Sequence, residues 1–68
     1  MMDWKERQQT LEQLIDAHGL ATVLDDLAII CAGKAEHIRS TYADNSLADL
    51  WEKNSDRIGR TIPLAHLL

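Results

Sequence analysis

The fold is decided by residues 20–41, which read LATVLDDLAIICAGKAEHIRST. Apolar residues recur here at helical spacing, and at about 100° per residue they form one stripe roughly 140° wide. The members of this stripe are Leu20, Val23, Leu24, Leu27, Ile30, Cys31, Ala35, Ile38 and Tyr42. The stripe is wider than one neighbouring helix needs. We therefore predict a long central helix with a neighbour on each side of the stripe.

Two residues of this central helix are unusual. Gly33 weakens a helix by about 0.5–1 kcal/mol relative to Ala, and it is compatible with a close helix contact, a kink or a break. Lys34 projects into the apolar stripe, where a charge is costly unless it is paired or reaches water. One interpretation is that Lys34 snorkels at the edge of the core. The other is that it pairs with an acidic group of a neighbouring helix or a partner chain.

A first helix is predicted over residues 4–18. Asp3 is a good N-cap, and Glu6 follows three residues later, as in a capping box. Gly19 suits the left-handed residue that follows a helix end. The apolar stripe of this helix consists of Trp4, Leu11, Leu14 and Ile15.

A third helix is predicted over residues 46–62. Ser46 and Asp49 have the spacing of a capping box, and Pro63 is expected to end the helix because it cannot donate the next hydrogen bond. The tail over residues 63–68 is apolar for a terminus, and it is expected to dock on the core, form a turn or bind a partner. The stripe of this helix consists of Leu47, Leu50, Trp51, Ile58 and Ile62.

These patterns predict an all-α fold, a small three-helix bundle with a long central helix, in one domain over residues 1–68. The connections are short, so consecutive helices are expected to be antiparallel neighbours. The residues expected to be buried lie within the three stripes: Leu14, Leu24, Leu27, Cys31, Ile38 and Trp51.

Composition narrows the range of partners. The 68 residues carry a formal net charge of −4, which disfavours direct binding to nucleic acid or to an anionic membrane surface. A protein partner with a basic patch is compatible with this charge. Cys31 is the only cysteine, which excludes a disulfide within the chain and favours a reducing, cytoplasmic location. We expect no signal peptide, because residues 1–9 are polar and lack an apolar h-region. We also expect no membrane span, because no apolar run approaches about 20 residues.

No arrangement of residues points to catalysis, a metal or a cofactor. The histidines are His18, His37 and His66, and none lies three or four residues from another. Cys31 and His37 are six residues apart, which places them on different sides of a helix. We therefore predict no catalytic, metal-binding or cofactor-binding residue, and no enzymatic activity.

The function expected from these features is a non-enzymatic protein-interaction module. Homo-oligomerisation is preferred over a different protein partner, because the stripe and the tail offer more apolar surface than a monomer covers. The candidate interface residues are Trp4, Ile29, Lys34, Trp51 and Leu67. The alternative is a helix-turn-helix-like nucleic-acid-binding protein. It is disfavoured because acidic residues alternate with the basic residues of the third helix and would repel phosphate.

The stretch from Ile30-Cys31 to Ile38-Arg39, with Leu47-Ala48 and Trp51, resembles small uncharacterised helical proteins of bacteria and their phages. The resemblance implies a phage-type accessory or inhibitor protein. It assigns no activity and no functional residue.

Overall fold

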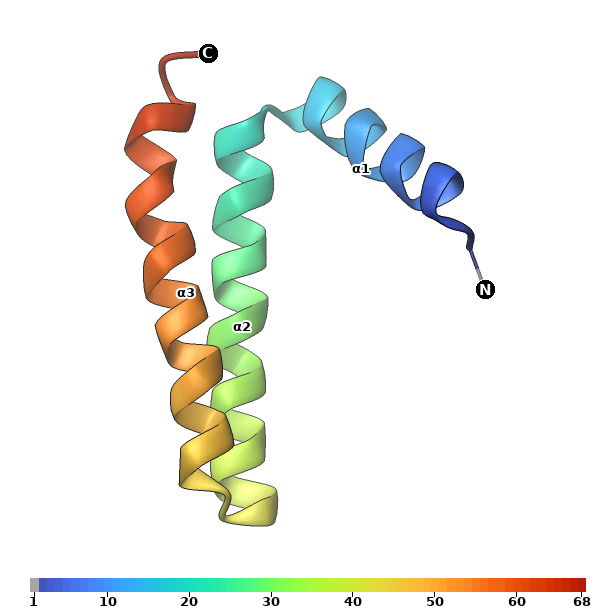
Figure 1. Ribbon diagram of the computed structural model, residues 1–68. Coiled ribbons are helices and arrows are strands. Elements are labelled where there is room, and N and C mark those ends of the chain that lie inside the picture. The colour runs from blue at the N-terminus through green and yellow to red at the C-terminus, as the bar shows by residue number, and fades with distance from the viewer. Residues whose placement is uncertain (1) are drawn as a thin grey trace.

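The computed structural model describes residues 2–68, and these form three α-helices and no strand. Helix α1 spans Trp4–His18, α2 spans Leu20–Tyr42 and α3 spans Asn45–Ala65 (Figure 1). The predicted fold class is confirmed: the protein is a small all-α bundle of three helices, and the central helix is the longest.

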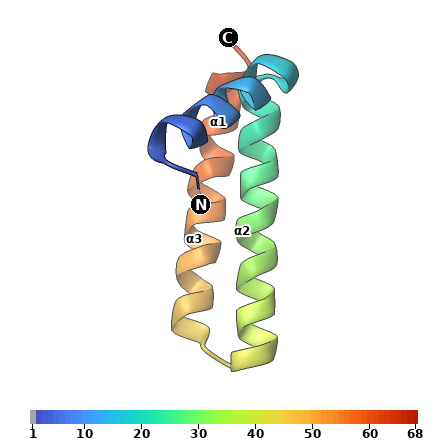
Figure 2. The same cartoon turned by 90° about the vertical axis from the view of Figure 1, so that its right-hand side faces the viewer.

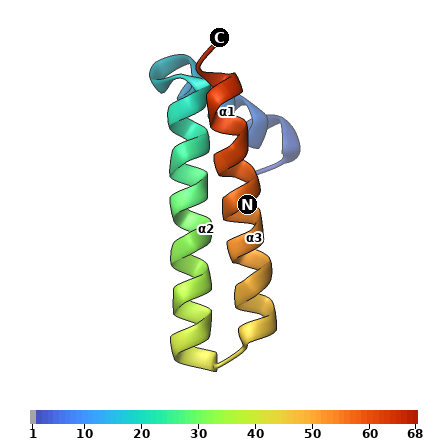
Figure 3. The ribbon, with the colours of Figure 1, turned by 90° about the vertical axis from the view of Figure 1, so that its left-hand side faces the viewer.

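The three helices are unequally packed. Helices α2 and α3 form an antiparallel hairpin and lie side by side along their length (Figures 1 and 3). Helix α1 contacts only α2, next to the joint between them, and then projects away from the hairpin (Figures 1 and 2). The prediction that α2 has a helix on each side is therefore wrong along most of its length. The prediction that α1 and α2 are antiparallel neighbours is also wrong.

Gly19 is the physical reason for this open angle. Its backbone has φ 87° and ψ 150°, in a region that is essentially restricted to glycine. A left-handed cap was expected at this position, but the observed conformation turns the chain outward. The molecule is consequently flat, with extents of 38 × 32 × 14 Å.

The start of α1 agrees with the sequence, whereas the start of α3 does not. Asp3 Oδ1 accepts a hydrogen bond from the Glu6 amide at 2.8 Å, as predicted for the N-cap. In α3 the cap is Asp44, whose Oδ1 accepts from the Leu47 amide at 3.0 Å, rather than Ser46. Asp and Ser are about equally good N-caps. Asp44 is the one that stands before the first helical residue.

The end of α3 lies beyond the predicted boundary. Pro63 is inside the helix, which continues to Ala65, and the His66 amide donates to the Ile62 carbonyl at 3.1 Å. Ala65 is only 6% exposed and lies near the start of α2, so ending the helix at residue 62 would lose this contact. Burial of the last turn thus outweighs the one hydrogen bond that the proline cannot make.

The contact between α2 and α3 is built from small side chains. Ala35 and Ala48 are 1% and 0% exposed. Ala21, Ala28 and Ala35 recur at an interval of seven residues, the period that keeps one seam facing a partner helix. Across the seam, the Ser55 hydroxyl donates to the Ala28 carbonyl at 2.8 Å. Small residues allow the two backbones to approach closely.

Because alanine occupies the seam, the large apolar residues flank it. The six residues predicted to be buried are not buried: Leu14 is 42% exposed and Leu27 is 39% exposed. The remaining four, Leu24, Cys31, Ile38 and Trp51, are half-buried. The predicted stripe is real, but α3 packs against its edge rather than its centre.

The structure decides between the alternatives for Gly33. Helix α2 is continuous through this residue, and a Cβ atom added there would meet nothing within 4 Å. Gly33 therefore marks neither a break nor a close helix contact.

We predict that Gly33→Ala raises the free energy of unfolding by about 0.5–1 kcal/mol, because alanine loses less backbone entropy in an exposed helix. Urea denaturation followed by circular dichroism at fixed protein concentration measures this change. Gly19→Ala is the control of opposite sign and should lower the same quantity by about 1–3 kcal/mol, since only glycine tolerates that backbone conformation. Destabilisation by Gly33→Ala would contradict the open space at this position.

We predict that Ala35→Leu lowers the free energy of unfolding by about 1–3 kcal/mol, because the seam has no room for a larger side chain. Ala32→Leu, on the same helix but exposed, should change it by less than about 0.5 kcal/mol. Thermal melting of both variants tests the seam. Equal effects of the two substitutions would show that α3 does not pack on Ala35.

Candidate protein interface

Two side-chain bridges join α2 and α3, one on each side of the alanine seam. On one side, Arg39 Nη1 donates to Glu52 Oε1 at 2.8 Å and Arg39 Nη2 donates to Asp49 Oδ1 at 3.1 Å. On the other side, Lys34 Nζ lies 5.5 Å from the centroid of the Trp51 ring. We call these the ionic side and the open side of the hairpin.

Helical spacing assigns the remaining residues of α2 to these sides. At about 100° per residue, Arg39 lies about 40° from Ala35 in one direction, and Lys34 lies about 100° from it in the other. Leu27 and Ile30 fall on the side of Lys34. The same spacing on α3 places Leu47 and Leu50 on the side of Trp51, away from the carboxylates that bind Arg39.

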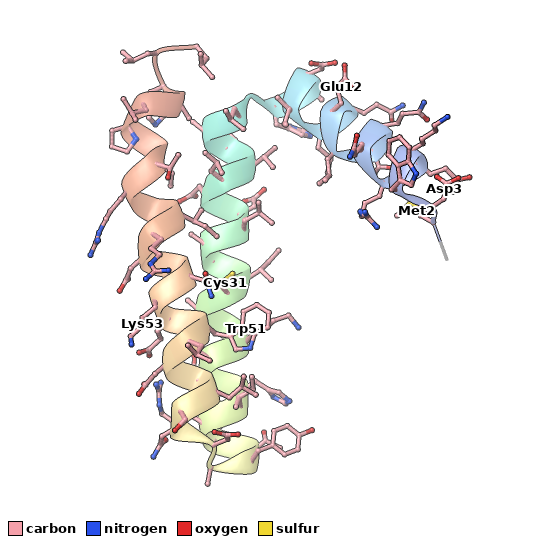
Figure 4. All side chains as sticks on the ribbon, in the orientation of Figure 1. Met2, Asp3, Glu12, Cys31, Trp51 and Lys53 are labelled. Atoms are coloured by element: carbon pink, nitrogen blue, oxygen red, sulfur yellow. The ribbon has the colours of Figure 1, made fainter. Side chains whose placement is uncertain are left out.

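The open side therefore carries large apolar side chains from both helices, with Lys34 among them. We call the apolar part of this side the open apolar face and define it by Val23, Leu27, Ile30, Leu47, Leu50 and Trp51. Ile30 and Leu50 are 54% and 56% exposed, and Leu47 is 43% exposed. Figure 4 shows Trp51 in front of α2, whereas Lys53 points away from the hairpin.

In the view of Figure 4, helix α1 projects to the side on which the Trp51 side chain leaves α3, whereas Lys53 points to the other side. Ile15 is the only residue of α1 that is not exposed, so the side of α1 that carries it is turned towards α2. Trp4 and Leu11 lie on that side at helical spacing, and they are 57% and 42% exposed. The apolar side of α1 and the open apolar face thus lie on the same side of the hairpin, and both are exposed.

The ionic side has a different character. The hydrogen bond to Glu52 is the main cause that raises the pKa of Arg39 above its usual value, and Asp49 adds to it. Like any arginine, Arg39 is charged at any practical pH. Its contacts fix the α2–α3 pairing near the hairpin turn from the side opposite the open apolar face.

The structure brings together only two of the five predicted interface residues, Lys34 and Trp51. Lys34 is exposed, and its ammonium group lies over the Trp51 ring; it has no acidic partner among residues 2–68. Trp4 lies at the far end of α1. Ile29, 61% exposed, is on the other side of α2 from the open apolar face, and Leu67, 81% exposed, follows the end of α3.

Sequence reasoning missed the exposure of Leu27, Ile30, Leu47 and Leu50. It treated them as members of the stripes that the bundle covers. The signal that could have found the face is the seven-residue repeat of Ala21, Ala28 and Ala35. That repeat identifies the seam and leaves the larger residues beside it without a partner.

The rest of the described surface offers no pocket of the usual size for a ligand. Two shallow hollows of about 210 Å³ lie between the start of α2 and the end of α3, below the usual range of about 300–1,000 Å³ for ligand pockets. Within residues 2–68, no group of three His, Cys, Asp or Glu side chains is placed to hold a metal ion. In the same part of the chain, no helix combines the length and apolar character needed to cross a membrane.

Comparisons of this chain with protein-family models, with curated proteins and with solved structures found no match.

We predict that Arg39→Gln lowers the melting temperature at low salt, because it removes both ion pairs on the ionic side. The difference from the unchanged chain should shrink in about 1 M salt, where the screening length falls to about 3 Å. Arg57→Gln changes the net charge equally without removing a contact between α2 and α3, and it should have a smaller effect at low salt. If both variants melt alike, the Arg39 contacts contribute nothing to the hairpin.

Proposed function

We propose that this chain is a cytoplasmic, non-enzymatic protein-interaction module that binds through the open apolar face. One observation carries the proposal. The only buried apolar residues between positions 2 and 68 are three alanines, whereas thirteen large apolar residues are at least 39% exposed. Folding of one copy alone therefore leaves most of the large apolar side chains in water.

Exposed apolar side chains of this kind favour contact with another protein, because the contact removes them from water. Soluble monomers rarely expose contiguous apolar patches larger than a few hundred Å², and larger patches usually mark interaction sites. Trp51 is half-buried within the face, and tryptophan is enriched among the residues that dominate binding energy. Lys34, whose ammonium group lies 5.5 Å from the centroid of the Trp51 ring, adds a cation within the face.

The nucleic-acid alternative receives no support from the hairpin. Helices α2 and α3 run antiparallel and side by side, whereas the two helices of a helix-turn-helix cross at about 90–120°. The net charge of −4 also opposes phosphate binding. An accessory or inhibitor role, as the resemblance implies, is compatible with an acidic module whose partner has a basic patch.

We predict that a photo-crosslinking amino acid in place of Ile30 forms covalent protein adducts in living cells, with this chain itself or with another protein. The same amino acid in place of Lys53, which points away from the hairpin, is the control and should form far fewer adducts. Gel analysis of the tagged chain after irradiation gives the yield. Absence of adducts at position 30, or equal yields at both positions, would contradict the proposal.

A further inference from the structure

The exposed area of the chain is larger than the average for a folded monomer of its mass. A folded monomeric protein of 7.7 kDa exposes about 4,300 Å², whereas this chain exposes 5443 Å². The excess is about 1,100 Å² per chain on the same scaling. Two copies that bury this excess against each other would remove about 2,200 Å², within the range of about 2,000–5,000 Å² for permanent homodimers.

The shape leads to the same number of copies. The radius of gyration is 13.9 Å, against about 11 Å for a compact chain of this length. Two copies whose centres lie about 10 Å apart, the ordinary distance between packed helices, would have a radius of about 15 Å. A compact protein of twice the length has a radius of about 14 Å. Two copies thus approach the compactness that one lacks.

Each chain also holds both halves of a self-complementary contact. The open apolar face lacks a covering helix, and the apolar side of α1 lacks a surface to cover. Helix α1 has 15 residues and α2 has 23, so α1 is about 22 Å long and reaches along about two-thirds of the hairpin. In a two-fold dimer, each copy supplies the helix that the other one needs.

We propose that the occupant of the open apolar face is a second copy of this chain. The two hairpins meet through their open sides, and α1 of each copy packs across the hairpin of the other. This inference rests on the proposed function, because it names the partner of the same surface. Ile30 lies inside the interface and Ile29, its neighbour in sequence, lies outside.

Sedimentation equilibrium of the 68-residue chain, from the nanomolar to the high micromolar range, tests the proposal. The expected result is a reversible species of twice the 7.7 kDa monomer mass. The melting temperature should rise with protein concentration, because association stabilises the folded state by mass action. A monomer mass throughout, with a melting temperature independent of concentration, would overturn the proposal.

Ile30→Glu and Ile29→Glu form a matched pair, since these adjacent isoleucines are 54% and 61% exposed. Ile30→Glu should weaken dimerisation by at least about 100-fold, because the symmetric interface loses the side chain twice and gains two buried carboxylates. Ile29→Glu should change the dissociation constant by no more than about twofold. Equal weakening by both variants would place the interface elsewhere and reject this dimer.

Circular dichroism at each concentration separates loss of association from loss of folding. If Ile30→Glu unfolds when dilute, its helix content should return only at concentrations at least about 100-fold higher than the unchanged chain needs. Helix content that stays low at every concentration, while Ile29→Glu dimerises normally, would assign Ile30 to the fold of the single chain and reject its place in the interface. Retention of the full dimer by Ile30→Glu would reject the proposal.

The crosslinking experiment distinguishes failure of this inference from failure of the proposed function. A monomer in solution whose position 30 crosslinks to a different protein would overturn the homodimer and keep the interaction module. A monomer without adducts would overturn both.

Discussion

The rest of the structure depends on one constraint, the contact of Ala35 with α3. Further alanines continue this seam: Ala21, Ala28 and Ala48. Two helices joined by small side chains approach closely and keep a fixed register. They also bury little apolar area, because an alanine removes far less surface from water than a leucine does. The hairpin thus gains a defined geometry and only a modest contribution to its stability from burial.

The same constraint determines where the large side chains lie. If α3 packed on the centre of the stripe instead, Leu24, Leu27 and Trp51 would lie between the helices. With alanine in the seam, these residues lie beside it, and Arg39 with its two carboxylates occupies the opposite side. On one side of the hairpin, charged side chains of α2 and α3 pair with each other. The other side carries mainly apolar side chains.

The sequence was sufficient to predict the helices but not their packing. Local signals such as the Asp3 cap and Gly19 set the ends of α1, because they act within a few residues of the backbone they control. Burial at Ala65, by contrast, comes from a contact across the fold, so the extension of α3 past Pro63 was missed. The predicted burial of Leu14 and Leu27 failed for a similar reason. A stripe records which side of a helix avoids water, and it does not record whether the cover comes from the same chain.

In the candidate interface, too, single residues could be predicted from the sequence, whereas their contacts could not. Lys34 and Trp51 could be selected from the sequence as unusual, because a cation in a stripe and a large aromatic residue both stand out. Their contact could not be predicted, since it depends on the antiparallel register of α2 and α3. Ile29 is a candidate interface residue in the sequence because it lies away from the stripe, but a single exposed isoleucine needs no partner. Ile30 looked ordinary because it belongs to the stripe, and yet it lies where the stripe has no cover.

The outward course of α1 leaves the open apolar face without a cover from the same chain. Had Gly19 adopted a conformation that folds α1 back, this helix could have covered the open apolar face within one chain. Its actual φ of 87° and ψ of 150° turn α1 away and leave two exposed apolar surfaces on the same side of the hairpin. An internal disulfide, a common means of stabilising a small chain, is excluded because Cys31 is the only cysteine. The alanine seam and the glycine joint together therefore leave the large apolar side chains only partly buried when one chain folds.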